Sequence, residues 1–304
     1  MALDRPIFWL GLAGLSPQQR AALVAVLPSQ PSSLPAWRVA KFLEADAWCV
    51  NGAAARLYDD GTLAVPDSRS AEADLLLKLD AVDRPLAFTT PLAVPEIEPL
   101  TTFNPDSERA VLMVLKKFET WLQSLRAQYF LGALLHRMLD SLPHAAYTLT
   151  HQSVLLAVVD ISQRRIDYLV DASPVQLEQA QWDQCLPGNH VNAYAVPSRF
   201  KQVGLREVMW QFAQHSATDL LPAAFRVGSI LLVRQPQVPE ALLKDSQRTL
   251  LRALEAAPTS LAQLLLSGLD AEQLGRDLAS LYFDGAVSAA SGEVSWLPSN
   301  HREI

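Results

Sequence analysis

The chain has 304 residues, of which 50% are apolar, and a net charge of −7 from 25 Lys and Arg against 32 Asp and Glu. This composition excludes a disordered chain, because such chains combine few apolar residues with a high net charge. The length is typical of two or more domains. Two cysteines, Cys49 and Cys185, are too few for a disulfide framework or a four-cysteine zinc site.

The sequence of the N-terminus is not typical of a targeting or membrane-spanning segment. The apolar run Ile7–Leu15 follows an acid and a proline rather than a basic stretch. It is also much shorter than the roughly 20 apolar residues of a membrane span. We therefore expect a cytoplasmic protein without membrane insertion.

Residues 1–92 are predicted to form a small α/β domain, because short apolar runs alternate with a helical pattern. Ser16-Pro17 is a typical helix start, and the helix is expected to continue to about Leu27. The predicted strands are Pro6–Leu12, Ala47–Val50, Leu63–Val65, Leu75–Leu79 and Arg84–Thr90.

This order of elements resembles a degenerate response-regulator receiver domain. A receiver has its phosphate-accepting Asp at the end of the third strand, where this chain has Asn51 after Ala47–Val50. It also has an acidic pair after the first strand, where this chain reads Gly11-Leu12-Ala13-Gly14. An amide cannot be phosphorylated, so the resemblance implies a pseudo-receiver that serves as a docking surface.

Residues 93–142 are predicted to be a linker and a long connector helix. The segment from Pro91 to Pro105 contains four prolines, which mark the linker. The pattern that follows predicts one helix of about 30 residues, or two helices joined near Gly132. Its stripe either forms a homodimer seam or packs on the core of its own chain. The stripe consists of Val111, Leu115, Phe118, Leu122, Leu125 and Tyr129.

Residues 143–240 are predicted to form a central α+β domain. Three apolar runs separated by polar turns favour an antiparallel meander. Its predicted strands are Ala145–Thr150, Val154–Asp160 and Ile166–Val170, followed by helices Pro174–Gln184 and Ser198–His215 and by the strand Phe225–Arg234.

Residues 241–304 are predicted to form a winged helix, from three helices and a hairpin. The helices are expected at Lys244–Ala256, between Pro258 and Gly268, and from Asp270 to Gly285, and the hairpin at Ala286–Ala290 and Glu293–Leu297.

The runs Leu264–Leu269 and Leu278–Val287 resemble the output half of bacterial PATAN-type regulators, which implies an interaction module. A DNA-binding helix needs cations to neutralise phosphates. The predicted recognition helix has three acids against the single cation Arg276, and the wing has Glu293 and no cation. We therefore expect protein contacts rather than DNA binding.

The middle of the chain is the best place for an anionic ligand. Residues 101–240 have a net charge of 0, against −4 for residues 1–100 and −3 for residues 241–304. Arg199 and Arg206 are seven residues apart and would share one face of the predicted helix. Further arginines flank the next strand, and Arg164-Arg165 lies in the preceding hairpin. The candidate ligand-binding residues are Arg199, Gln202, Arg206, Trp210, Arg226 and Arg234.

Arginine grips phosphate with a planar fork and stacks on bases. A cyclic dinucleotide has two phosphates and two purine faces, so this set of residues suits it. The alternative is that the arginines solubilise the surface or pair with Asp160, Glu207 and Asp219.

The sequence contains no recognisable catalytic or metal-binding motif. It has neither a G-x-S-x-G nucleophile turn nor a Walker A sequence, and no two histidines have metal-ligand spacing. Asp59-Asp60-Gly61 is better explained as a turn than as a catalytic carboxylate pair. We therefore expect no enzyme activity, no catalytic residues, no metal and no cofactor.

As a whole, the chain resembles betaproteobacterial regulators that pair a receiver-like domain with an output domain, some of them linked to cyclic-di-GMP and type IV pili. The resemblance implies a non-enzymatic cyclic-di-GMP effector that acts on pili or motility through a protein partner, met by the N-terminal or the C-terminal domain. The alternatives are a winged-helix transcription regulator and a ligand-free scaffold. Ligand or partner binding would reposition the outer domains by favouring one of two arrangements.

Overall fold

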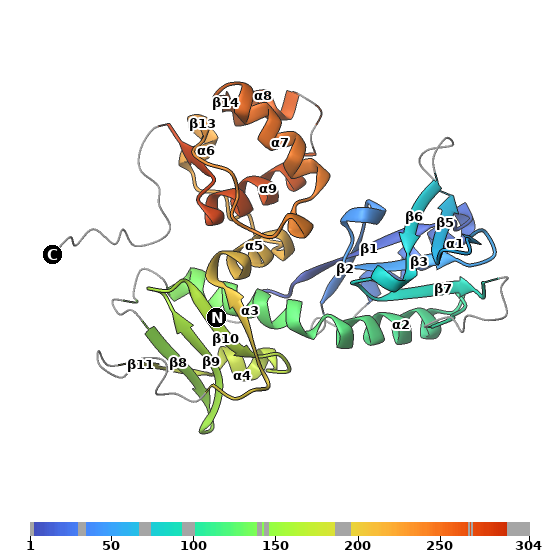
Figure 1. The fold of residues 1–304 in the computed structure, drawn as a ribbon, viewed down its shortest axis with the longest axis horizontal. Helices are drawn as coiled ribbons and strands as arrows, with labels where there is room; N and C mark the ends of the chain where they lie inside the picture. Colours follow the sequence, from blue (N-terminus) through green and yellow to red (C-terminus); the bar gives the residue numbers. More distant parts are fainter. Residues whose placement is uncertain are drawn as a thin grey trace. The chain divides into compact units, whose positions relative to one another are not determined.

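The computed structural model describes residues 3–29, 35–66, 74–92, 101–138, 142, 146–185, 196–266, 268 and 270–290 (Figure 1). The chain divides into two compact units, and each contains both helices and sheets. The first unit is Arg5–Gln123, and the second begins at Ser124 and includes the residues before Arg5. The expected mixed α and β fold class is confirmed. In the ranges given above, no helix has the length and apolar character needed to cross a membrane.

The first unit is built on a parallel sheet with the order β2-β1-β3-β7. Its central strand β1 is buried along its whole length, as expected for an apolar run covered on both faces. The helix α1 begins with the predicted cap, a reciprocal pair of hydrogen bonds between Ser16 and Gln19. The elements are β1 (Ile7–Ala13), α1 (Pro17–Val26), β2 (Ala36–Ala40), β3 (Ala47–Asn51) and β7 (Leu86–Thr90).

The edge strand β2 was not predicted, because prolines precede it and its five residues lack an alternating pattern. Trp37 of β2 is buried, and its Nε1 donates a hydrogen bond of 3.3 Å to Oε1 of Glu119 on α2 (Glu108–Trp121). A second, antiparallel sheet lies between β3 and β7 in the sequence. It consists of β4 (Arg56–Leu57), β5 (Thr62–Pro66) and β6 (Asp74–Lys78).

The connector is two helices, α2 and α3 (Gln123–Met138), that meet at Leu122. The prediction of one helix, or of a break near Gly132, was wrong. Gly132 lies inside α3, where a Cβ would come within 2.5 Å of the Cβ of Phe212, so it permits a close approach of helices. The apolar stripe is largely buried within the chain, which favours packing on its own core over a dimer seam.

The second unit contains a five-stranded antiparallel sheet with the order β11-β8-β9-β10-β12. The predicted meander is confirmed by its central strands. The hydroxyl of Tyr168 lies 2.7 Å from Oγ of Ser124 and accepts from Nε2 of Gln128 at 2.9 Å, which ties the sheet to α3. The strands are β8 (Ala146–His151), β9 (Val154–Asp160), β10 (Arg165–Leu169), β11 (Gln181–Gln184) and β12 (Phe200–Gly204).

Two helix predictions in this region were too long. The helix expected at Pro174–Gln184 ends as α4 (Pro174–Glu178), and strand β11 follows it. The helix expected at Ser198–His215 begins only at α5 (Leu205–His215), because residues 200–204 pair with β10 as β12.

The last part of the second unit combines helices with a small sheet of order β14-β13-β15. The three predicted helices are confirmed, including the cap Asp270 and the left-handed Gly285 that closes α9. The middle strand of this sheet, β13, comes from the segment before residue 241, where the predicted winged helix begins. A strand was expected at Phe225–Arg234, but the first residues of that range belong to the helix α6. The predicted hairpin arm Glu293–Leu297 lies outside the described residues. The elements are α6 (Ala224–Val227), β13 (Ser229–Leu232), α7 (Asp245–Ala256), β14 (Thr259–Ser260), α8 (Leu261–Leu266), α9 (Ala271–Asp284) and β15 (Val287–Ala289).

The helices α5 and α9 pack side by side in the core of the second unit (Figure 1). Phe212 of α5 and Phe283 of α9 have ring centroids 6.5 Å apart. Nearly every side chain from Leu274 to Asp284 is buried, so α9 is a core helix rather than a surface helix.

Short 3-10 helices are η1 (Leu27–Ser29), η2 (Phe42–Glu44), η3 (Leu79–Ala81) and η6 (Glu240–Leu242).

Candidate functional site

The carboxyl edge of the parallel sheet is closed by the chain's own hydrogen bonds. Ligands of open α/β sheets bind outside this edge. Here Nδ2 of Asn51 donates to the carbonyl oxygen of Gly14 at 3.1 Å, and its Oδ1 accepts from the Thr90 hydroxyl and from the backbone of Ala53. A Cβ on Gly52 would come within 2.2 Å of the carbonyl oxygen of Thr90. At this edge the side-chain amide of Asn51 is already used in hydrogen bonds, whereas a phosphate acceptor would need a free carboxylate at this position.

The cysteines give no ready nucleophile. Cys49 and Cys185 are free thiols, and both are buried. Burial raises the pKa of each thiol, and for Cys185 the charge of Asp160 raises it further. In the part of the chain that the structure describes, no group of three or more His, Cys, Asp or Glu could hold a metal ion.

Three arginines from separate segments converge in the second unit, and we call Arg164, Arg206 and Arg234 the arginine cluster. Arg164 is in the β9–β10 turn with a φ of 53°, Arg206 is the second residue of α5, and Arg234 follows β13. The backbone of Leu205 donates to the carbonyl oxygen of Arg164 at 2.8 Å, which ties the turn to the start of α5. The pKa of Arg206 is lowered from its ordinary value by burial, then by the charges of Arg234 and Arg164.

The buried carboxylate of Asp284 compensates part of this positive charge. It is fully buried, and its Oδ2 lies 3.0 Å from Nη2 of Arg234. It also accepts from the backbone of Gln237 at 3.1 Å and 3.2 Å, while Nη1 of Arg206 donates to Oε1 of Gln237. The charge of Asp284 opposes the lowering of the Arg206 pKa. Among the described residues, Asp284 is the one carboxylate that forms an ion pair with this cluster, and its partner is Arg234, so Arg164 and Arg206 contribute positive charge that no such pair offsets.

The cluster also lies at a helix N-terminus. The N-cap of α5 is Gly204, which has no side chain to accept from the first-turn N–H groups. These groups and the helix dipole favour an anion. Nε of Arg206 is buried and has no hydrogen-bond partner in the described part of the chain. Glu207 is the one acid of the first turn, and burial raises the pKa of its carboxyl, with Lys201 opposing.

Arg199 and Gln202 do not join the cluster, so the predicted helix face was wrong. Both precede α5, and Arg199 lies before the first residue of β12. The strand is five residues long, about 16 Å, so Arg199 and Arg206 flank opposite ends of it. Nε2 of Gln202 donates to Oδ1 of Asp167 at 3.3 Å, so the Gln202 amide forms a hydrogen bond to the neighbouring strand β10.

Trp210 and Arg226, two of the predicted ligand-binding residues, also lie outside the arginine cluster. Trp210 is 1% exposed in the core, so its indole cannot stack on a bound base, and this part of the prediction was wrong. Arg226 lies on α6 and forms an ion pair with Asp219, as the alternative interpretation expected. Gln237 and Asp284 were not predicted as site residues, because no local sequence pattern links them to Arg206.

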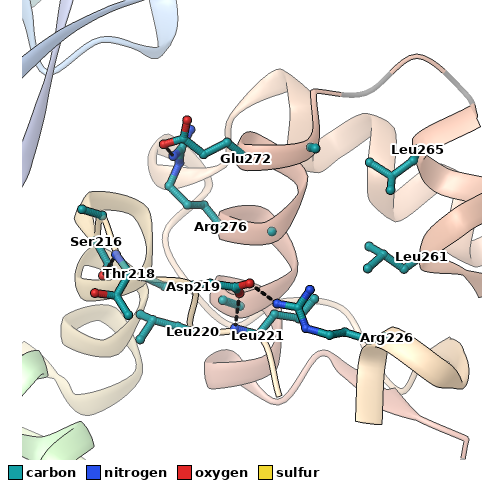
Figure 2. Close-up of a pocket in the computed structure, with 15 residues that line it drawn as sticks. Ser216, Thr218, Asp219, Leu220, Leu221, Arg226, Leu261, Leu265, Glu272 and Arg276 are labelled. Carbon is teal, nitrogen blue, oxygen red and sulfur yellow. Dashed lines mark hydrogen bonds and ion pairs between the residues drawn. The ribbon is translucent and has the colours of Figure 1, made fainter. Parts of the chain in front are cut away.

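A cavity of about 240 Å³ lies between α8, α9, α6 and the segment after α5 (Figure 2). Its polar lining includes two ion pairs, Arg226 with Asp219 and Arg276 with Glu272, together with Ser216 and Thr218. Its apolar walls come mainly from leucines and alanines. The lining residues include Ala213, Leu220, Leu221, Leu261, Leu265, Ala271, Gly275 and Ala279.

No protein-family model matches this chain, and no curated protein or solved structure matches it either. Its function is therefore inferred from its own residues and their geometry.

Proposed function

We propose that the protein is a non-enzymatic signalling protein whose arginine cluster binds a phosphorylated nucleotide, with cyclic-di-GMP as the first candidate. The observation that carries this proposal is that Arg206 lies near the charges of Arg164 and Arg234, while the buried carboxylate of Asp284 pairs with Arg234 and is linked to Arg206 through Gln237. The excess positive charge lies beside a helix N-terminus without a side-chain cap. Both features favour an anion at the same place.

Phosphate suits the cluster better than other anions do. Each guanidinium carries five N–H donors, and a phosphate oxygen accepts several hydrogen bonds at once. A bound phosphate would also relieve the repulsion that lowers the pKa of Arg206. Because Trp210 is buried, stacking on the bases would come from the guanidinium planes themselves.

The first unit would then serve as the surface for a protein partner. Its strand order β2-β1-β3-β7 agrees with the order of doubly wound sheets of the flavodoxin type, which supports a receiver-like interpretation. The engaged Asn51 fits a domain without phosphoryl transfer. A role in pilus function or motility belongs to this proposal through the resemblance alone.

The alternative of a transcription regulator is less well supported. A recognition helix must enter the major groove and present side chains to base edges. In α9, the helix expected to do so, nearly all side chains from Leu274 onwards are buried, and α5 packs along it. The ligand-free scaffold is favoured only by the pairing of Arg226 with Asp219.

Calorimetric titration of the full chain with cyclic-di-GMP, with GTP as a competitor, tests the proposal. We expect saturable binding that weakens more than about tenfold in Arg206→Ala, equivalent to about 1.4 kcal/mol. Arg199→Ala is the matched control, because Arg199 is an exposed arginine beyond the other end of β12. Its affinity should equal that of the wild type. No binding at high micromolar ligand, or equal losses in both variants, would refute the proposal.

A further inference from the structure

The helices α8 and α9 face the cavity with side chains of opposite size. Ala271, Gly275 and Ala279 lie on one face of α9, since each is four residues from the next. Leu261 and Leu265 of α8 line the same cavity, and both side chains are seen there in Figure 2. A Cβ on Gly275 would meet no atom within 4 Å. The helices therefore leave an apolar space that none of the lining side chains fills.

One end of this space is rich in hydrogen-bond donors. Asp219 uses both oxygens, since Oδ1 accepts from the backbone of Leu221 at 3.0 Å and Oδ2 accepts from Nη2 of Arg226 (Figure 2). The guanidinium of Arg226 has five donors, and its side chain is 48% exposed. The other cation, Arg276, donates to Glu272 at 2.6 Å and to Gln273 at 3.1 Å. Arg226 is therefore the group best placed to bind a ligand acceptor.

We propose that this cavity binds a small organic monocarboxylate with an apolar body. The carboxylate accepts from Arg226, and the apolar body lies between the leucines of α8 and Gly275 of α9. The volume of about 240 Å³ is below the range of roughly 300–1,000 Å³ typical of drug-sized ligands, so the ligand is small.

The charges of the lining select this class of ligand. Asp219 and Glu272 offset the two guanidinium groups of the lining, so a dianion such as a phosphate monoester would bring more negative charge than Arg226 can compensate. A cationic ligand finds both carboxylates already paired with guanidinium groups. A neutral ligand would offer no charged acceptor to the N–H donors of Arg226 that Asp219 does not use, whereas a single carboxylate matches them. The site shares no residue with the arginine cluster, so it does not rest on the proposed function.

Saturation-transfer NMR on the full chain tests the proposal with 3-phenylpropionate and 4-methylpentanoate as probes and 3-phenylpropionamide as the uncharged analogue. We expect saturable binding of the acids and at least about tenfold weaker binding of the amide, or about 1.4 kcal/mol. Arg226→Gln should abolish the preference for the acid. Lack of saturable binding of both acids at millimolar concentration, or equal affinity for acid and amide, would overturn the proposal.

The position of the site is tested by filling the cavity. Gly275→Leu places a side chain in the open space and should abolish binding, whereas Gly275→Ala adds one methyl group and should preserve it. Thermal melts show whether each variant is folded. Ala271→Leu on the same face of α9 replaces Gly275→Leu if the latter does not fold. Unchanged probe binding in a folded, filled variant would place the probe elsewhere and refute the assignment.

Discussion

Replacing Asp284 with Asn tests whether one carboxylate holds the arginine cluster together. The side chain of Asp284 is fully buried, 3.0 Å from Nη2 of Arg234, whose own side chain is 27% exposed. Breaking a buried ion pair by removing one partner costs about 3–5 kcal/mol. We expect about 2–3 kcal/mol for Asp284→Asn, since water can solvate part of Arg234 and the amide oxygen can still accept from the backbone of Gln237.

Urea unfolding, followed by the transition of the second unit, measures this loss of stability. The control is Asp245→Asn, which removes the exposed partner of Arg248 at 3.1 Å and should cost no more than about 1 kcal/mol. Millimolar inorganic phosphate should raise the melting temperature of Asp284→Asn more than that of the wild type, because it supplies the missing negative charge. Equal costs for the two variants would refute the reasoning, as would the absence of a phosphate effect.

Two further predictions concern the packing of the helices. Burial raises the pKa of the Asp277 carboxyl above its value in the unfolded chain, so the free energy of unfolding should fall as the pH rises from about 4 through the folded pKa. Asp277→Asn should flatten this fall in urea titrations at several pH values, and parallel curves for variant and wild type would contradict it. Gly132→Ala should cost about 1–3 kcal/mol, because its Cβ would come within 2.5 Å of Phe212, and Gly275→Ala, in open space, should cost nothing or stabilise α9. Similar melting temperatures for the two alanine variants would show that α3 and α5 are not closely packed at Gly132.

Elements with local signals were predicted correctly from the sequence. The cap at Ser16, the cap at Asp270 and the closing Gly285 are each set by residues within one helical turn. The meander was predictable for the same reason, since its polar turns are short.

The short edge strands could not be predicted in this way. The strand β12 contains Lys201 and Gln202 and exists because it pairs with β10, about 35 residues away in the sequence. The pairing partner lies outside any local window, so the helical pattern of α5 was extended backwards to Ser198.

The residues of the candidate site were predicted only in part. The seven-residue spacing of Arg199 and Arg206 has meaning only on one continuous helix, and Gly204 divides that segment into a strand and a helix. The cluster that does form places Arg206 near the charges of Arg164 and Arg234, which come from distant parts of the sequence. The sequence did indicate this region, because residues 101–240 lack the net negative charge of the rest of the chain and contain Arg164, Arg206 and Arg234.

The arginine cluster lies where a ligand could link the antiparallel sheet of the second unit to its C-terminal helices. The start of α5 is bonded to the β9–β10 turn through Leu205 and Arg164, and the end of α9 holds Asp284 against Arg234. An anion bound to all three arginines would therefore contact the antiparallel sheet and the C-terminal helices at once. A ligand shifts an equilibrium only by its different affinities for two arrangements. Separating the sheet turn from the end of α9 would break the three-arginine site, so binding would favour the arrangement in which the two are held together.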